Sequence, residues 1–204
     1  MNKKKSLIII IASLLTTSVW AKPVWLPLKE KVIEADLAGD KNKQKKLAKE
    51  ALTIAADCLE KNREEIGCLY YRAQALGLSS QSFFGYVKRL HSMFADWEKV
   101  LAVDPTFDYG GPYRMVAEVY MELPKHFGPK DLRQDLNKAE DDLQKAIAIS
   151  HYPTNHLDMA ELLIALGKKT EVKQELERVK KILPQWKTTP YYRSWQSTLE
   201  RLEK

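Results

Sequence analysis

The sequence predicts an all-α fold in which antiparallel helix hairpins stack side by side with irregular repeats. The first observation is a four-then-three spacing of apolar or small residues, which places three side chains on one stripe of a helix. The second is a proline five residues after the second and fourth stripes, where a helix would need to end. The third is a composition rich in Ala, Leu, Lys and Glu with only 8 Gly, which favours helix over sheet. The four stripes are Ala51/Ala55/Cys58, Met93/Trp97/Val100, Ala139/Leu143/Ala146 and Val172/Leu176/Val179.

The remaining signals divide the chain into expected helices. Gly39 ends the first helix, and Ser79 or Ser80 can cap the fourth. Pro112 opens the fifth helix, and Pro124 follows its end. The last segment has its apolar residues on one side and is expected to cap the C-terminal end of the stack. The expected spans are 28–38, 42–61, 66–78, 80–104, 112–122, 131–149, 156–166, 170–183 and 191–202.

The fourth stripe and its preceding helix resemble a tetratricopeptide (TPR) unit. Ala160 stands where the two helices of such a unit approach closely, and Gly167 and Pro184 fall at matching spacings. This resemblance implies a right-handed, TPR-like α-solenoid. The intervals between successive stripes are 42, 46 and 33 residues, so the middle units carry insertions, expected in 79–86, 105–111 and 123–130. Such insertions commonly carry specificity in repeat proteins.

The first 21 residues read as a signal peptide. Three lysines precede the apolar run 7–15, and small residues lead to Ala21. The run is too short to span a membrane, and no cysteine near the cut can accept a lipid. We therefore expect one helical domain at 22–204, located in the periplasm without a stable membrane anchor. Three of the 33 Lys and Arg lie in the signal, against 27 Asp and Glu, so the mature net charge is about +3. That balance does not favour nucleic acid as a partner.

Two segments resemble a more particular family. They are 104–114, which reads Asp-Pro-Thr-Phe-Asp-Tyr-Gly-Gly-Pro-Tyr-Arg, and 152–155, which reads Tyr-Pro-Thr-Asn and is followed by Ala160-Glu161. Together they resemble the periplasmic T-component of tripartite ATP-independent periplasmic (TRAP) transporters, most closely over 97–167. The resemblance implies an auxiliary protein that forms a trimer and contacts the substrate-binding subunit. Members are often lipoproteins, and this chain departs from that pattern.

Cys58 and Cys68 are the only cysteines. They lie near the end of one expected helix and the start of the next, almost symmetric about a turn at Arg63. An exported compartment is oxidising, so this placement predicts a disulfide. The alternative is two small buried thiols.

The candidate ligand or partner surface surrounds the insertions. Gly110 and Gly111 form a turn before Pro112, and with Arg114 their N–H groups could hold a carboxylate or phosphate. The alternative is a tight turn that sets the entry of the helix. Aromatic residues beside the insertions belong either to the core or to a recognition surface. The candidate residues are Phe84, Tyr86, Phe107, Tyr109, Gly110, Gly111, Arg114 and Asn155.

No catalytic or metal-binding constellation is recognisable. The four histidines show no HExxH spacing, no GxSxG occurs, and nothing suggests a cofactor. We therefore expect a protein that binds and does not catalyse. Three roles stay open, namely the auxiliary protein of a transporter, a generic scaffold of envelope assembly, and a carrier of a small amphipathic ligand.

Overall fold

A computed structural model describes residues 22–79, 85–126 and 129–204. Over these residues the chain forms nine α-helices and two short 3₁₀ turns, with no β-strand. The expected signal peptide and Phe84 lie outside the described residues. The α-helices are α1 (Leu26–Asp36), α2 (Lys41–Lys61), α3 (Ile66–Ser79), α4 (Tyr86–Val103), α5 (Phe107–Glu122), α6 (Leu136–Ile149), α7 (Pro153–Ala165), α8 (Lys169–Ile182) and α9 (Tyr192–Leu202). The 3₁₀ turns are η1 (Lys130–Leu132) and η2 (Leu183–Trp186).

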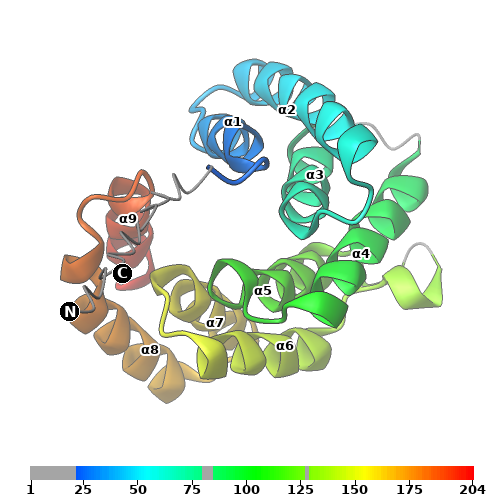
Figure 1. Ribbon diagram of the computed structural model, residues 1–204. Coiled ribbons are helices and arrows are strands. Elements are labelled where there is room, and N and C mark those ends of the chain that lie inside the picture. The colour runs from blue at the N-terminus through cyan, green and yellow to red at the C-terminus, as the bar shows by residue number, and fades with distance from the viewer. Residues whose placement is uncertain (1–21, 80–84, 127–128) are drawn as a thin grey trace, which may run out of the picture.

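The helices form a curved array around a central space (Figure 1). Each of α1 to α8 packs against its neighbour in the chain, and α9 packs on α7 and α8. As Figure 1 shows, α1 and α9 face one another across the open side of the curve. This curvature turns one face of α1, α5, α7 and α9 toward a common interior, where the candidate site lies.

The four predicted stripes are the buried seams of α2, α4, α6 and α8. All twelve of their side chains are buried, from Ala51 at 0% exposed to Val172 at 8%. Small residues dominate the stripes of α2 and α6, so neighbouring helices can approach closely there. The prediction of an all-helical chain held together by these stripes is therefore confirmed.

Several helix starts differ from the sequence prediction, among them that of α5, which begins at Phe107 and not at Pro112, and a capping side chain decides that of α6. α6 begins at Leu136, since the carboxylate of Asp135 accepts a hydrogen bond from Lys138 N at 3.0 Å. α7 begins three residues earlier than expected, with Pro153 in its first turn. α4 begins at Tyr86, after Gly85 in a left-handed conformation with φ 75°.

The disulfide prediction agrees with the structure. Cys58 and Cys68 are bonded, with their Cα atoms 6.3 Å apart, and they link the end of α2 to the start of α3. Polar side-chain contacts add further links between neighbouring helices. The guanidinium of Arg72 donates two hydrogen bonds to the buried Asp96, and buried His156 contacts Glu175 at 2.5 Å. Within the described residues, none of the helices combines the length and apolarity needed to cross a membrane.

Candidate functional site

A left-handed turn at the start of α5 organises the interior of the curve. Asp108, Tyr109 and Gly110 have φ values of 48°, 63° and 78°. For the two non-glycine residues this conformation is unfavourable by about 1–2 kcal/mol each, so side-chain contacts must compensate. Gly110 has no such cost, and its Cα lies against the backbone of Ala146, where a Cβ would approach to 3.0 Å.

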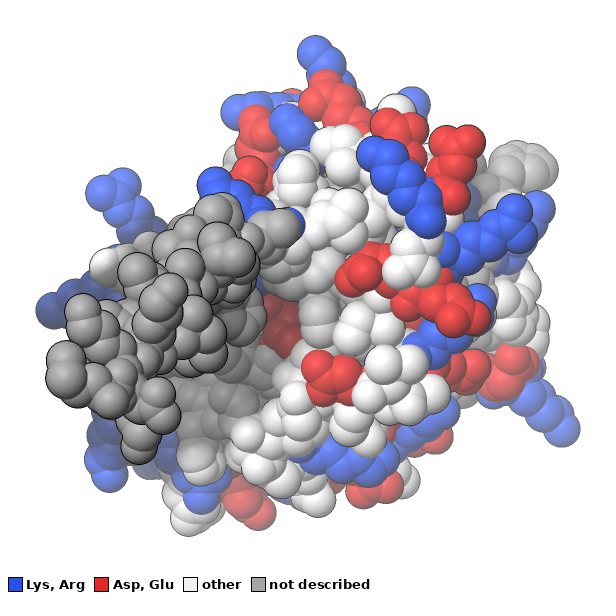
Figure 2. Space-filling model, viewed as in Figure 1, with Lys and Arg blue, Asp and Glu red and all other residues white. Residues whose placement is uncertain are grey.

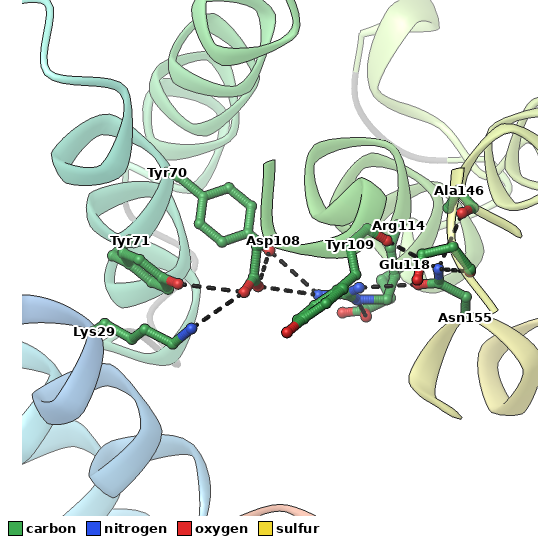
Figure 3. A network of polar contacts seen from close by, with 10 residues as sticks. Lys29, Tyr70, Tyr71, Asp108, Tyr109, Arg114, Glu118, Ala146 and Asn155 are labelled. Carbon is green, nitrogen blue, oxygen red and sulfur yellow. Dashed lines mark hydrogen bonds and ion pairs between the residues drawn. The ribbon is translucent and has the colours of Figure 1, made fainter. Parts of the chain in front are cut away.

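Asp108 obtains its compensation from three donors (Figure 3). Its carboxylate accepts hydrogen bonds from the hydroxyl of Tyr70 at 3.0 Å and from that of Tyr71 at 3.4 Å. Lys29, on α1, contacts the same carboxylate at 3.3 Å. A carboxylate with three donors from α1 and α3 fixes the turn of α5 against both helices.

Arg114 connects this turn to α7. Only 5% of the residue is exposed. Its Nη1 donates to Asn155 Oδ1 at 2.9 Å, and its Nη2 donates to the Tyr70 hydroxyl at 3.3 Å and lies 3.6 Å from Asp108 Oδ2. Burial disfavours the charge, but Tyr70, Asp108 and Glu118 outweigh it and raise the pKa of Arg114. Arg114 is therefore a permanently charged, structurally engaged group.

Asn155 is fully buried and holds the other side of the turn. Its amide nitrogen donates to the carbonyls of Tyr109, Ala146 and Ser150 at 3.0, 3.1 and 3.0 Å (Figure 3). It thereby ties α5 to the end of α6. The two sequence segments 104–114 and 152–155 are thus joined directly, through Arg114 and Asn155 and through the rings of Tyr109 and Tyr152, which stack with centroids 4.6 Å apart.

These contacts form one wall of a cavity of about 340 Å³, here called the central cavity. Its volume is at the lower end of the range for small-molecule sites. An aromatic side comes from α3, α5, η2, α9 and the residues just before α7 and α9. A polar side comes from α1, α5 and α7. The aromatic lining residues are Tyr71, Tyr109, Tyr152, Trp186, Tyr191 and Trp195, and the charged ones are Lys29, Asp36, Asp108, Arg114, Glu118, Asp158 and Glu161.

Carboxyl groups line the polar side. In Figure 2, white uncharged side chains and red carboxylates lie near the centre of this face, and many blue side chains project from the outline of the molecule. Burial and the proximity of Asp158 raise the pKa of Glu118 well above its usual range. Burial likewise raises the pKa of Asp158, to about 7, and that of Asp36. The Glu118 side chain is 37% exposed and lines both the central cavity and a second hollow.

The predicted site residues separate into two groups. Tyr109 and Arg114 line the central cavity, whereas Gly110 and Asn155 support it from behind. Gly111 is buried against Tyr70, where a Cβ would overlap the tyrosine hydroxyl.

Two further candidates lie away from the cavity. Phe107 packs its ring on Trp25, Tyr70 and Tyr71 and belongs to the core edge. Tyr86 lies apart, in a smaller hollow beside Leu76 and Leu90.

Sequence reasoning did not find the carboxyl groups. Glu118 stands four residues after Arg114, and Asp158 three residues after Asn155, so each shares a helix face with a predicted site residue. That spacing was a usable signal. Asp36 and Trp186 carry no comparable signal, because they reach the cavity only through the curvature of the whole array.

We expect Asp158→Asn to change how stability depends on pH. Asp158 and Glu118 hold protons more tightly in the folded chain than in the unfolded one, where such carboxyls titrate near pH 4. Stability should therefore fall as pH rises from about 4 to about 8. The variant removes one of the paired charges, so its free energy of unfolding should exceed that of the wild type by about 1 kcal/mol at pH 8 and by little at pH 4.

Urea denaturation at both pH values measures this difference. Asp57→Asn, on the exposed face of α2, is the matched control and should follow the wild type. A wild type and an Asp158→Asn variant with parallel pH profiles would contradict the prediction.

Comparison with known proteins adds no assignment to this geometry. No protein-family model and no curated protein matches the chain.

Proposed function

We propose that this chain is a non-catalytic, TPR-like interaction protein of the periplasm, and that in its sharpest form it is the auxiliary T-component of a TRAP-type uptake system. In this role it contacts the substrate-binding subunit and assembles as a trimer. The single observation that carries the proposal is the meeting of 104–114 and 152–155. These two segments, which carry the resemblance to the family, lie together at the wall of the central cavity.

Two further features support the proposal. The Cys58–Cys68 disulfide is typical of proteins that mature in an oxidising compartment. Tyr109 is 43% exposed beside the cavity, although it is held by stacking on Tyr152. A rigid, exposed aromatic side chain is a common anchor in protein interfaces.

Capture of partners from a periplasmic extract of the source organism tests the transporter role. Immobilised 22–204 should retain a solute-binding protein, identified by mass spectrometry. Tyr109→Ala should reduce its recovery, whereas Val103→Ala, at a 70% exposed position at the end of α4, should not. Recovery of envelope-assembly proteins without a solute-binding protein would instead favour a generic scaffold.

The central cavity favours a second candidate function, the carrier of a small amphipathic ligand. Its volume, its aromatic side and its converging charged groups are those of a small-molecule site. Native mass spectrometry of the purified chain tests for a retained ligand. A carrier would show an added small-molecule mass, whereas a chain that binds only protein partners would show its own mass.

A further inference from the structure

The central cavity has more negative than positive side chains, and both of its cations are already engaged. Lys29 contacts Asp108. Arg114 uses Nη1 on Asn155 and Nη2 on Tyr70, and its Nε is covered, without a hydrogen-bond partner, 3.8 Å from Glu118 Oε1. A ligand carboxylate would therefore compete with existing partners for both cations and would approach the nearby carboxyls as well. This geometry disfavours the anionic ligand that the sequence alone suggested for Arg114.

Three carboxyl groups at the cavity have no firm cationic partner. The closest contact is that of Glu118 with Arg114 Nε, at 3.8 Å, which is too long for a hydrogen bond. Asp158 Oδ2 is covered and has no hydrogen-bond partner, and the carboxyl groups of Asp158 and Glu118 interact with one another. Asp36, on α1, interacts with the hydroxyl of Tyr191, which is not a cation. The two remaining carboxyls are paired, Asp108 with Lys29 and Glu161 with Arg201.

The aromatic side supplies the complementary surface. Tyr152 and Trp186 meet edge to face with centroids 5.0 Å apart, and Tyr191 stacks on Trp195 at 5.9 Å. Aromatic faces attract an ammonium group, and their apolar bodies cover the rest of a small ligand. A bare metal ion would not use this surface. Among the described residues, no group of three or more His, Cys, Asp or Glu is placed to hold a metal ion.

We infer that the central cavity binds a small organic cation, with its ammonium group between Asp36, Glu118 and Asp158 and its apolar body against the aromatic side. The inference rests on the carrier function proposed above. The ammonium would lie among the three carboxyl groups and would balance negative charge that is otherwise balanced only by a proton.

Protons should compete with this ligand. The other titratable or charged groups of the central cavity come from α1, α3, α5, α7 and the residues before α7 and α9; they are Lys29, Asp36, Tyr71, Asp108, Tyr109, Arg114, Tyr152, Glu161 and Tyr191. Lys41 and Glu122 lie with Glu118 and Asp36 in a second hollow. No histidine is among the lining residues. Since the pKa of Asp158 is raised to about 7, the carboxyl pair gains negative charge between mildly acidic and mildly alkaline pH. Binding of the cation should therefore tighten as pH rises through this interval.

Three probes that share one aromatic body test the charge preference. Titration calorimetry at about pH 8 compares 2-phenylethylamine, 2-phenylethanol and phenylacetate. We expect the amine to bind at least about tenfold more tightly than the other two probes. Its affinity should fall by a similar factor at about pH 5.5, although the amine stays protonated there.

The variants Asp158→Asn and Glu118→Gln should each weaken binding of the amine by about tenfold or more, whereas Asp57→Asn should leave its affinity unchanged. Thermal unfolding of each variant distinguishes weaker binding from loss of the fold, because Asp158→Asn is expected to be at least as stable as the wild type at this pH. Equal or tighter binding of phenylacetate would overturn the inference and leave the carrier function in place. If none of the three probes bound at millimolar concentration, both the cation inference and the carrier function would be overturned. Partner capture would still test the transporter role separately.

Discussion

An Arg114→Met variant is expected to lose about 3–5 kcal/mol of unfolding free energy, the range for breaking a buried charge pair by removing one partner. Arg114 lies on α5, and only 5% of the residue is exposed. Its guanidinium contacts Tyr70 on α3 and Asn155 on α7. Methionine fills similar space but donates no hydrogen bond. The carboxylate of Asp108 and the Asn155 oxygen would then lose a buried donor or cation.

Urea denaturation followed by far-UV circular dichroism measures the loss. Arg193→Met, at an exposed position on α9, is the matched control and should change stability by less than about 0.5 kcal/mol. Arg114→Lys should fall between them, because lysine keeps the charge but not the planar fork that reaches two helices at once. Equal stability of Arg114→Met and Arg193→Met would show that the guanidinium network is not a structural centre.

Removing the disulfide is the second large change. The double variant Cys58→Ala, Cys68→Ala should lose about 3 kcal/mol, because the bond closes a short loop and restricts the unfolded chain. Alanine is the suitable replacement because both cysteines are buried, Cys58 at 5% exposed and Cys68 at 0%. A serine hydroxyl at either position would need a hydrogen-bond partner.

A reductant series checks this result on the same instrument. Reduced wild type should approach the stability of the double variant, and reductant should leave the double variant unchanged. A reduced wild type as stable as the oxidised one would contradict the predicted contribution of the bond.

The helices could be predicted from the sequence because each stripe is a local property. Ala139, Leu143 and Ala146 share one face by helix geometry alone, whatever surrounds them. Helix starts were less certain, since a cap depends on one side chain. Asp135 caps α6, and Asp131, four residues earlier, is an equally plausible cap by residue type.

The candidate site was predictable only in part. Tyr109, Arg114 and Asn155 stood out through their motifs, and Asn155 proves to be hydrogen-bonded to both Arg114 and the carbonyl of Tyr109. The left-handed conformation of Asp108 was not predictable, because few aspartates adopt it and the Tyr70 hydroxyl that holds this carboxylate is remote in sequence. The carboxyl cluster depends on bringing Asp36 and Asp158 together across the curve, which no local pattern encodes.

The central cavity draws its lining from both ends of the described chain. Lys29 and Asp36 come from the first helix, and Trp186 and Trp195 from the last part. A molecule seated between them would bridge segments that are remote in sequence and would favour the state in which both are docked. Occupancy of the central cavity should therefore suppress fraying of α1 and α9 together. Limited proteolysis or amide exchange at these two helices would then detect a bound ligand without any signal from the ligand itself.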